Sequence, residues 1–183
     1  MAGGKSSRMG EDKAFLKVGG ERVIDRTLHI FRDFFNEIIL VTNSPLDFMD
    51  LDVTIVTDMM FGKGVPGGLY TGLFYSSSRH AFIAPCDMPF LNRSFIKYML
   101  EVTDDYDIVV PETTPGLQPL HAVYSRKCLP HIKALMDTGE FRVNRFYHKG
   151  RMLTISEDII LSFDPNLRMF VNINSPEDLS LIS

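Results

Sequence analysis

A loop rich in glycine, hydroxyl and basic side chains runs from Ala2 to Lys13 near the start of the chain. Gly3 and Gly4 are followed by Arg8, and the loop ends in Gly-Glu-Asp-Lys at Lys13. Glycines let backbone N–H groups approach phosphate oxygens closely, and the two cations can neutralise charge that backbone dipoles leave exposed. The pattern therefore predicts a polyphosphate cradle, with a flexible Gly/Ser-rich arm as the alternative.

The spacing of this loop separates it from two familiar phosphate-binding motifs. In this loop no Gly-Lys-Ser/Thr follows four residues after a glycine, and its glycines do not have the spacing G-x-G-x-x-G. The loop resembles the opening L-A-G-G-x-S-x-R-M-G-x-D-K of a group of nucleotidyltransferases, and its R-M-G-x-D-K ending is most similar to the molybdenum cofactor guanylyltransferase family. Sugar-phosphate nucleotidylyltransferases share A-G-G but continue G-x-G-T-R-L, so they match less well.

An aspartate follows the short apolar run Ala81–Ala84, in the order Pro-Cys-Asp-Met-Pro-Phe-Leu. Asp87 lies where a parallel strand would end, and Mg²⁺ favours one or two carboxylates together with phosphate oxygens and water. The alternative is an Asx-turn before Pro89. The segment resembles the family's C-D-x-P-[FY]-[LI] motif, which implies that Asp87 holds Mg²⁺. Cys86 has no basic partner before it and is expected to be a buried hydrophobe rather than a nucleophile.

A second segment follows the run Val53–Thr57 and reads Asp-Met-Met-Phe-Gly-Lys-Gly-Val-Pro-Gly-Gly-Leu from Asp58. It resembles the family's D-x(n)-G-P-[LM]-[AGS]-G-[LIM] segment, with Val65 where glycine is usual. The resemblance implies that Asp58 lies in the nucleotide site. Gly67 and Gly68 can let the backbone pack against a base or ribose, with an ordinary helix start as the alternative.

The remaining family-like segments concern the acceptor. Gly-Glu-Phe-Arg resembles a G-x-x-[RS] segment, which implies that Arg142 binds the acceptor, with Arg145 in reserve and solvated helix charges as the alternative. The ending Phe-Val-Asn-Ile-Asn-Ser-Pro-Glu-Asp-Leu resembles F-x-N-[IVL]-N-[TS]-P-E-[ED]-L and implies the same role for Asn172 and Asn174. Strand alternation would place these two on one face. His121, within an apolar run, is expected to be a core histidine.

The resemblance further implies how these residues share the reaction. Lys13, Asp87 and Arg8 are the expected catalytic residues. The expected nucleotide-binding residues are Ala2, Gly3, Gly4, Lys13, Asp58, Gly67, Gly68 and Asp87. The substrates would be GTP with Mg²⁺ and molybdopterin, and a molybdoenzyme or delivery chaperone would receive the product. A cytidylyltransferase making the cytosine dinucleotide and a non-catalytic nucleotide- or cofactor-binding homologue are the alternatives.

The composition of the chain indicates the number of domains and excludes several classes of partner. The chain has 183 residues, 45% of them hydrophobic and 23% charged, so we expect a single domain over residues 1–183. A net charge of −4 offers no general attraction for nucleic acid or an anionic membrane. Two cysteines are too few for a disulfide scaffold, and no apolar run approaches the roughly 20 residues of a membrane span. We expect a cytoplasmic protein.

Short apolar runs alternate with amphipathic segments, which predicts an α/β fold. We expect a Rossmann-like, three-layer fold of the nucleotide-diphospho-sugar transferase type with a mostly parallel sheet. The expected strands are residues 37–42, 53–57, 81–84, 107–111, 120–124, 152–155 and 169–173. Helical stripes are centred on Ile24–Phe35, Leu69–Phe74, Phe95–Leu100 after an Asn92 cap, and Cys128–Leu135, with a terminal helix starting at Ser175.

One expectation concerns the strand that precedes the loop. In the family this loop follows a buried apolar strand, whereas here the motif begins at Ala2. Either the upstream residues lie outside the sequence given or the sheet lacks this strand. A central strand that is lacking would leave two backbone edges exposed, which is a structural liability.

Overall fold

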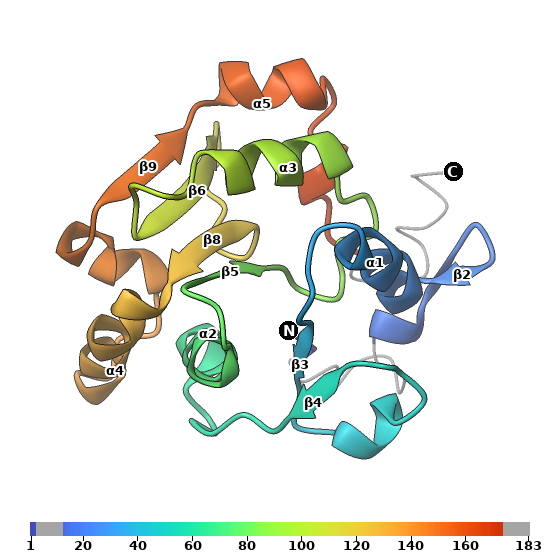
Figure 1. Cartoon of the computed structure of the whole chain (residues 1–183), viewed down its shortest axis with the longest axis horizontal. Helices are drawn as coiled ribbons and strands as arrows, with labels where there is room; N and C mark the ends of the chain where they lie inside the picture. Colours follow the sequence, from blue (N-terminus) through green and yellow to red (C-terminus); the bar gives the residue numbers. More distant parts are fainter. Residues whose placement is uncertain (3–12, 174–183) are drawn as a thin grey trace.

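The computed structural model describes residues 1–2 and 13–173, which form helices and short strands (Figure 1). The strands are β1 (Lys17–Val18), β2 (Glu21–Arg22), β3 (Ile39–Val41), β4 (Thr54–Val56), β5 (His80–Ile83), β6 (Ile108–Thr113), β7 (Gly116–Leu117), β8 (Ala122–Ser125) and β9 (Met152–Ile155). The α-helices are α1 (Val23–Arg32), α2 (Gly64–Tyr75), α3 (Arg93–Glu101), α4 (Leu129–Asp137) and α5 (Glu157–Phe163). Short 3₁₀ helices are η1 (Lys13–Phe15), η2 (Pro45–Phe48), η3 (Arg126–Cys128), η4 (Val143–Lys149) and η5 (Arg168–Phe170).

The strands form a large sheet and two small ones. The large sheet has the order β5-β8-β6-β7, with β9 pairing with β6. β6 and β9 run parallel, whereas β8 is antiparallel to both β5 and β6. β3 and β4 form a separate parallel pair, and β1 and β2 form an antiparallel hairpin. The α/β class is confirmed, but the described part of the large sheet is mixed rather than mostly parallel: β6 and β9 pair in parallel, whereas β7 and β8 pair antiparallel with their neighbours.

Helices cover both faces of the large sheet, giving three layers (Figure 1). Alternate residues of a strand point to opposite faces, so Val109 and Val123 join one core cluster while Ile108 and Tyr124 join another. The first cluster contains residues of α3 and α5, and the second contains residues of α2 and α4. This alternation accounts for the near-continuous apolar runs of β6 and β8, since both faces are buried.

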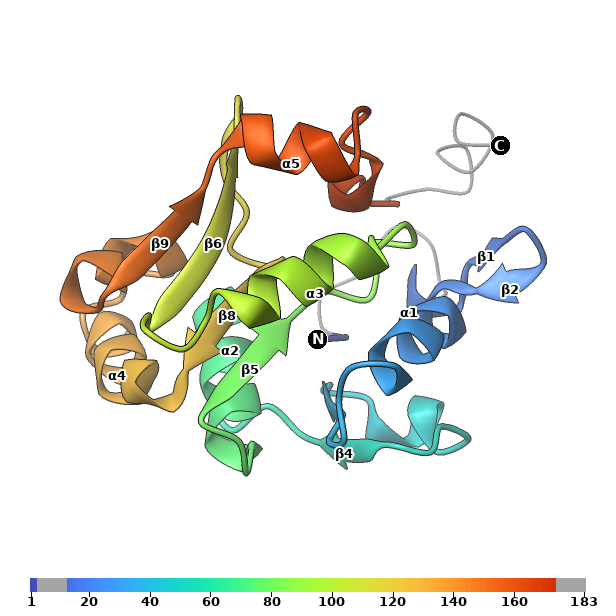
Figure 2. The same ribbon diagram turned by 45° about the horizontal axis from the view of Figure 1, so that its top comes forward.

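Met1 and Ala2 join the large sheet to the β3–β4 pair. Ala2 N–H donates to the Val41 carbonyl at 2.9 Å and forms a parallel bridge with Thr42. On the other side, the Met1 amino group donates to Ala84 O at 2.8 Å, and Cys86 N–H donates to Met1 O at 3.1 Å. In Figures 1 and 2 the N-terminus accordingly lies in the middle of the molecule. The two residues thus occupy, over a short length, the place expected for a strand before the loop.

Most of the expected elements are present. Asn92 caps α3 as predicted, since its Oδ1 accepts a hydrogen bond from Phe95 N–H at 3.0 Å. α2 begins at Gly64, so Gly67 and Gly68 lie inside the helix rather than before it. The helix expected from Ser175 lies outside the described residues. None of the helices in the described part is both long and apolar enough to cross a lipid bilayer.

The strand predicted at residues 169–173 is wrong. This segment contains the end of η5, followed by irregular backbone up to Ile173. Leu167 adopts a left-handed conformation with φ of 51°, which turns the chain into the 3₁₀ helix. Ile173 then donates its N–H to the carbonyl of Asp87 at 2.8 Å. The apolar alternation that suggested a strand instead reflects Met169 and Ile173 entering the core singly.

His121 lies fully buried in an aromatic cluster. Its ring is within 6 Å of the rings of Phe82, Phe95 and Phe170, at centroid distances of 5.2, 5.8 and 5.0 Å. Neither ring nitrogen has a hydrogen-bond partner among the described residues. Burial lowers the pKa of His121 to about 3, so the folded protein holds a neutral imidazole, as expected for a core histidine.

This burial predicts acid sensitivity. Between about pH 6.5 and pH 3 the unfolded chain binds a proton at His121 that the folded protein does not. The free energy of unfolding should therefore fall as the pH drops through this range, by up to about 1.4 kcal/mol per pH unit from this group. Urea unfolding between pH 7.5 and 5 should show a shallower loss for His121→Phe than for wild type. The exposed His148→Gln control should keep the wild-type slope, and superimposable slopes for wild type and His121→Phe would contradict the assignment.

Candidate functional site

Lys13 and Asp87 face each other at the end of the loop that the sequence predicts to bind phosphate. Lys13 Nζ lies 3.8 Å from Asp87 Oδ2, and the two side chains are 30% and 25% exposed. Lys13 is the first residue of η1, and Asp87 follows β5 by four residues. The structure thus brings together the cation and the carboxylate that the sequence assigned to phosphate and Mg²⁺. Both remain accessible to a ligand.

One apolar cluster holds both ends of the loop. Ala2 and Ala14 are buried, and they pack in the same cluster as Leu40, Phe48 and Cys86. Since Ala14 adjoins Lys13, its burial fixes the backbone from which the lysine projects. The predicted loop residues Gly3, Gly4 and Arg8 lie outside the described residues. Cys86 is 7% exposed, in keeping with the expectation of a buried cysteine.

The segment that carries Asp87 is held by hydrogen bonds to its backbone from three sides. Cys86 bonds Met1, Ile173 N–H donates to Asp87 O, and Arg26 Nε donates to Pro89 O at 3.4 Å. These contacts come from the N-terminus, the C-terminal segment and α1. The position of the carboxylate therefore depends on parts of the chain that are distant in sequence.

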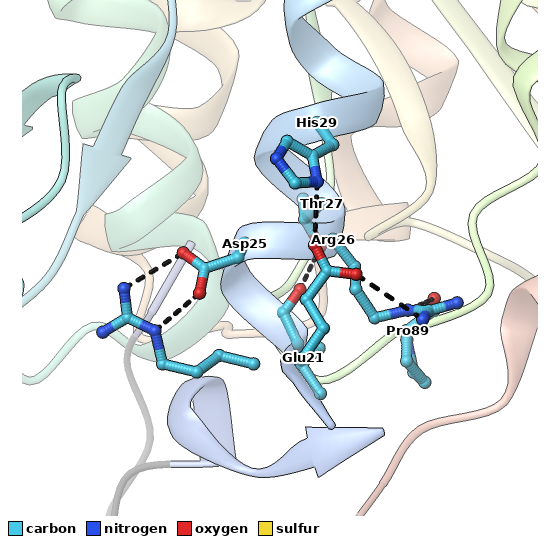
Figure 3. Close-up of polar contacts among 8 residues, drawn as sticks. Glu21, Asp25, Arg26, Thr27, His29 and Pro89 are labelled. Atoms are coloured by element: carbon cyan, nitrogen blue, oxygen red, sulfur yellow. Dashed lines mark hydrogen bonds and ion pairs between the residues drawn. The ribbon is translucent and has the colours of Figure 1, made fainter. Parts of the chain in front are cut away.

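A polar network on α1 and β2 supports the same segment (Figure 3). Glu21 lies between Arg26 and His29, with Oε2 3.7 Å from Arg26 Nη1 and Oε1 2.7 Å from His29 Nδ1. Glu21 thereby orients the guanidinium that bonds Pro89. Sequence analysis missed these residues. The i, i+3 spacing of Arg26 and His29 was available as a signal, but it predicts a charged helix face rather than a partner.

Asp58 is engaged by its own loop. Its Oδ1 accepts hydrogen bonds from Met60 N–H at 2.9 Å and from Thr71 Oγ1 at 3.0 Å, which ties the end of β4 to α2. Gly67 lies against the same loop, because a Cβ there would be 2.9 Å from Met60 O and 3.1 Å from Asp58 Oδ2. At Gly68 a Cβ would be 2.4 Å from Met1 Cε. Close backbone packing thus accounts for Gly67, whereas the contact at Gly68 is with the end of a flexible side chain. Nucleotide binding by Asp58, Gly67 and Gly68 stays a prediction.

The predicted acceptor residues lie in two places. Asn172 is exposed and directly precedes Ile173, so the hydrogen bond to Asp87 O brings it beside the Lys13–Asp87 pair. Asn174 lies outside the described residues. Arg142 lines a separate pocket of about 280 Å³ with Val65, Leu117 and Phe141.

Arg142 is already paired in the structure. Its guanidinium bonds both carboxylate oxygens of Glu140 at 3.2 Å, and these bonds lower the pKa of Glu140 to about 2. An anionic acceptor would have to compete with Glu140 for this guanidinium. The reserve Arg145 also reaches Glu140, with Nε 3.6 Å from Oε2.

The donor set around Asp87 is compatible with Mg²⁺. In the described part of the chain no three His, Cys, Asp or Glu side chains are grouped to enclose a metal ion. Asp87 offers one partly exposed carboxylate. Mg²⁺ bound with a nucleotide takes most of its ligands from phosphates and water and needs only one or two carboxylates. The residues therefore fit an ion that arrives with its substrate.

The family model and the curated relatives identify the chain as a nucleotidyltransferase. Residues 1–153 match the family described as MobA-like NTP transferase domain, and the chain belongs to this family. A molybdenum cofactor guanylyltransferase from Desulfosudis oleivorans is 38% identical over 98% of this chain and 90% of its own length. A probable molybdenum cofactor guanylyltransferase from Natranaerobius thermophilus is 34% identical, with the same coverage of both chains.

Solved structures show the same fold. The molybdopterin-guanine dinucleotide biosynthesis protein A from Archaeoglobus fulgidus superposes with a TM-score of 0.83 at 20% identity, covering 98% of this chain and 93% of its own. The 2-C-methyl-D-erythritol 4-phosphate cytidylyltransferase from Thermus thermophilus gives a TM-score of 0.69 at 16% identity, covering 92% and 91% of the two chains. The fold is thus shared with nucleotidyltransferases of different substrates.

Two glycines of α2 provide a matched test of the packing around Asp58. Gly67→Ala should lower the free energy of unfolding by more than about 1 kcal/mol, because the new Cβ meets backbone at Met60. At Gly72 a Cβ would meet only Val41 Cγ2, at 3.6 Å. Gly72→Ala should therefore stabilise the protein by up to about 1 kcal/mol through helix propensity. Urea unfolding of both variants measures this, and an equal effect of the two substitutions would refute the close packing at Gly67.

Proposed function

We propose that this chain transfers GMP from GTP, with Mg²⁺, to molybdopterin, forming molybdopterin guanine dinucleotide and releasing pyrophosphate. The observation that carries the proposal is the accessible Lys13–Asp87 pair at the end of the loop. Support for the substrates comes from the relatives, which are named as molybdenum cofactor guanylyltransferases and match the chain over nearly its whole length.

The reaction needs no nucleophile from the protein. A terminal phosphate oxygen of the acceptor attacks the α-phosphorus of GTP, and the bond from this phosphorus to the bridging oxygen breaks, so that pyrophosphate leaves with the electron pair. The second pKa of a phosphate monoester is about 6, so the attacking oxygen is already ionised near neutral pH. Catalysis then consists of aligning two anions and neutralising their charge.

The site residues divide this work by position. Lys13 and Arg8 neutralise charge on the α-phosphoryl group and the leaving pyrophosphate, and the loop of Ala2, Gly3 and Gly4 supplies backbone N–H donors. Asp87 would hold the Mg²⁺, which would supply further charge neutralisation for the phosphates.

Two further groups orient the substrates. Asp58, Gly67 and Gly68 shape the nucleoside side of the site, where Gly67 and Gly68 lie in the first two turns of α2. Asn172 and Asn174 orient the acceptor phosphate, since Asn172 directly precedes the residue that bonds Asp87. Arg142 binds the acceptor farther away, beside its own pocket.

The proposal extends to the cellular setting. A reaction that consumes GTP fits the cytoplasm, and the product would pass to a molybdoenzyme or a delivery chaperone. These assignments follow from the substrates proposed above.

Removing the charge of Lys13 should slow transfer. With Mg²⁺, GTP and molybdopterin, Lys13→Ala should lower kcat for pyrophosphate release by about 10²–10³-fold, the usual effect of losing one group that stabilises transition-state charge. Asp87→Asn should lower kcat by a similar factor, because the amide is a poor Mg²⁺ ligand. Lys97→Ala is the matched control, since Lys97 is 69% exposed on α3 and pairs only weakly with Glu101.

Three results would contradict the proposed function. Turnover with CTP in preference to GTP would favour the cytidylyltransferase. Calorimetric binding of GTP with no pyrophosphate release would favour a non-catalytic binding protein. An unchanged rate of pyrophosphate release for Lys13→Ala would show that the Lys13–Asp87 pair has no catalytic role.

A further inference from the structure

A short polar segment joins α4 to η4. Its two ends are fixed, because Met136 of α4 and Val143 of η4 are both buried in the same core cluster. Between these ends, Phe141 and Arg142 are exposed and Glu140 is half-buried. The segment therefore has anchored ends and presents side chains that a ligand can reach.

The carboxylate of Glu140 accepts four hydrogen bonds from its own segment. Its Oε1 accepts from the backbone N–H groups of Phe141 and Arg142, both at 3.0 Å. The Arg142 guanidinium donates to both carboxylate oxygens at 3.2 Å, and Arg145 Nε lies 3.6 Å from Oε2. Successive backbone N–H groups and a guanidinium fork are the donors that proteins use to bind phosphates and carboxylates. Glu140 thus occupies an oxyanion site with its own side chain.

Positive charge around this carboxylate exceeds the single negative charge that it supplies. In the described part of the chain, the ion pairs of Arg142 and Arg145 are both made with Glu140. A third cation lies close by, because α2 packs beside α4 (Figure 1) and Lys63, just before α2, has its Nζ 5.7 Å from the centroid of the Phe141 ring. A ligand with two negative charges would therefore match this site better than one carboxylate does.

The pocket of about 280 Å³ that Arg142 lines adjoins the same segment. Most of its other lining residues are apolar, among them Leu117, Pro119, Leu120 and Phe141. An apolar wall next to a guanidinium group suits a ligand with an apolar or aromatic body and a charged end. Together with the excess of positive charge, this indicates an organic phosphate monoester.

Glu140 can leave this site at little cost to the fold. Its partner Arg142 is exposed, and ion pairs at the surface are weak because water and salt screen them. The preceding Gly139 is exposed, and no atom lies within 4 Å of the place where its Cβ would be, so the chain has room to move there. The hydrogen bonds from Arg142 lower the pKa of Glu140 to about 2, so it leaves as a charged carboxylate at neutral pH.

We propose that Glu140 is an exchangeable internal ligand: an organic phosphate monoester displaces it from Arg142 and Arg145 and places its apolar body in the adjoining pocket. The second pKa of such an ester is about 6, so it is a dianion at pH 7.5 and can serve both guanidinium groups. A monoanion would replace one negative charge by another and gain little. Two sources carry this chemistry, the acceptor and a separate phosphate ester. The first rests on the proposed transfer reaction, whereas the exchange itself does not.

The test titrates the full chain with phenyl phosphate and follows backbone amides by ¹H–¹⁵N NMR. The amides of Phe141 and Arg142 should shift, because they exchange the carboxylate of Glu140 for a phosphate oxygen. Glu140→Gln should lower Kd at least about fivefold, since the competing charge is removed. A residue that merely oriented Arg142 for the ligand would give the opposite change, a higher Kd. Adding molybdopterin distinguishes the sources: shifts of the same amides would assign the site to the acceptor, and their absence to a separate ester.

Matched controls separate this exchange from a general effect of charge. Asp137→Asn removes a nearby negative charge that pairs with Lys133 instead, so its Kd should stay within about twofold of wild type. Arg142→Ala should abolish the shift at Phe141, with or without Glu140→Gln. Benzenesulfonate has the same ring with a single charge and should bind at least about tenfold more weakly than phenyl phosphate.

Three results would overturn the proposal. Absence of any shift at Phe141 and Arg142 in the wild-type chain would show that no phosphate ester displaces Glu140. A Kd that is unchanged or higher in Glu140→Gln would show that the carboxylate does not compete with the ligand. Equal affinity for benzenesulfonate would show that the site does not select a dianion. Because the readout is binding and not pyrophosphate release, failure of the proposed function leaves this test unaffected.

Discussion

Three backbone hydrogen bonds made by Met1 and Ala2 hold the β3–β4 pair in register with β5 of the large sheet. They connect Val41 on one side with Ala84 and Cys86 on the other. Because Ala2 begins the predicted phosphate-binding loop and Cys86 precedes Asp87, the same bonds set the distance between Ala2 and the carboxylate. A shift of β3 relative to β5 would therefore be transmitted to the site without any change in a site residue.

The site is assembled by hydrogen bonds from distant segments to the backbone around Asp87. Met1, Arg26 and Ile173 are far apart in sequence, and each contributes to the placement of Asp87. The side chain of Glu21 does not contact this segment itself; it orients Arg26, which does. This division explains why a carboxylate that is 25% exposed can keep a defined position.

The sequence was sufficient where a local pattern determines structure and insufficient where a long-range contact decides. The alternating apolar runs predicted the α/β class, and Asn92 was correctly predicted to cap α3. The rule that ligands gather at strand ends favoured Asp87 as a site residue, and the resemblance of the loop to nucleotidyltransferases placed Lys13 in the same site. It could not show that Ile173 enters the core singly to bond Asp87 O, which is why a strand was expected there. The close contact that requires glycine at position 67 could not be predicted either. It is made with Met60 O, which lies in a loop, and the path of a loop does not follow from hydrophobic periodicity.

The narrow connection at Met1 and Ala2 also has a consequence for how the native state fluctuates. β3, β4 and the cluster around Leu40 and Phe48 form a block with its own small core, joined to the large sheet through few backbone bonds in the described chain. Such a block meets the conditions for a foldon, a unit that opens cooperatively at a lower free energy than global unfolding. Sub-global opening would then break the Ala2–Val41 hydrogen bond first and leave the β5-β8-β6 sheet intact. The opening with the lowest free energy would thus separate Ala2, the first residue of the predicted loop, from β3.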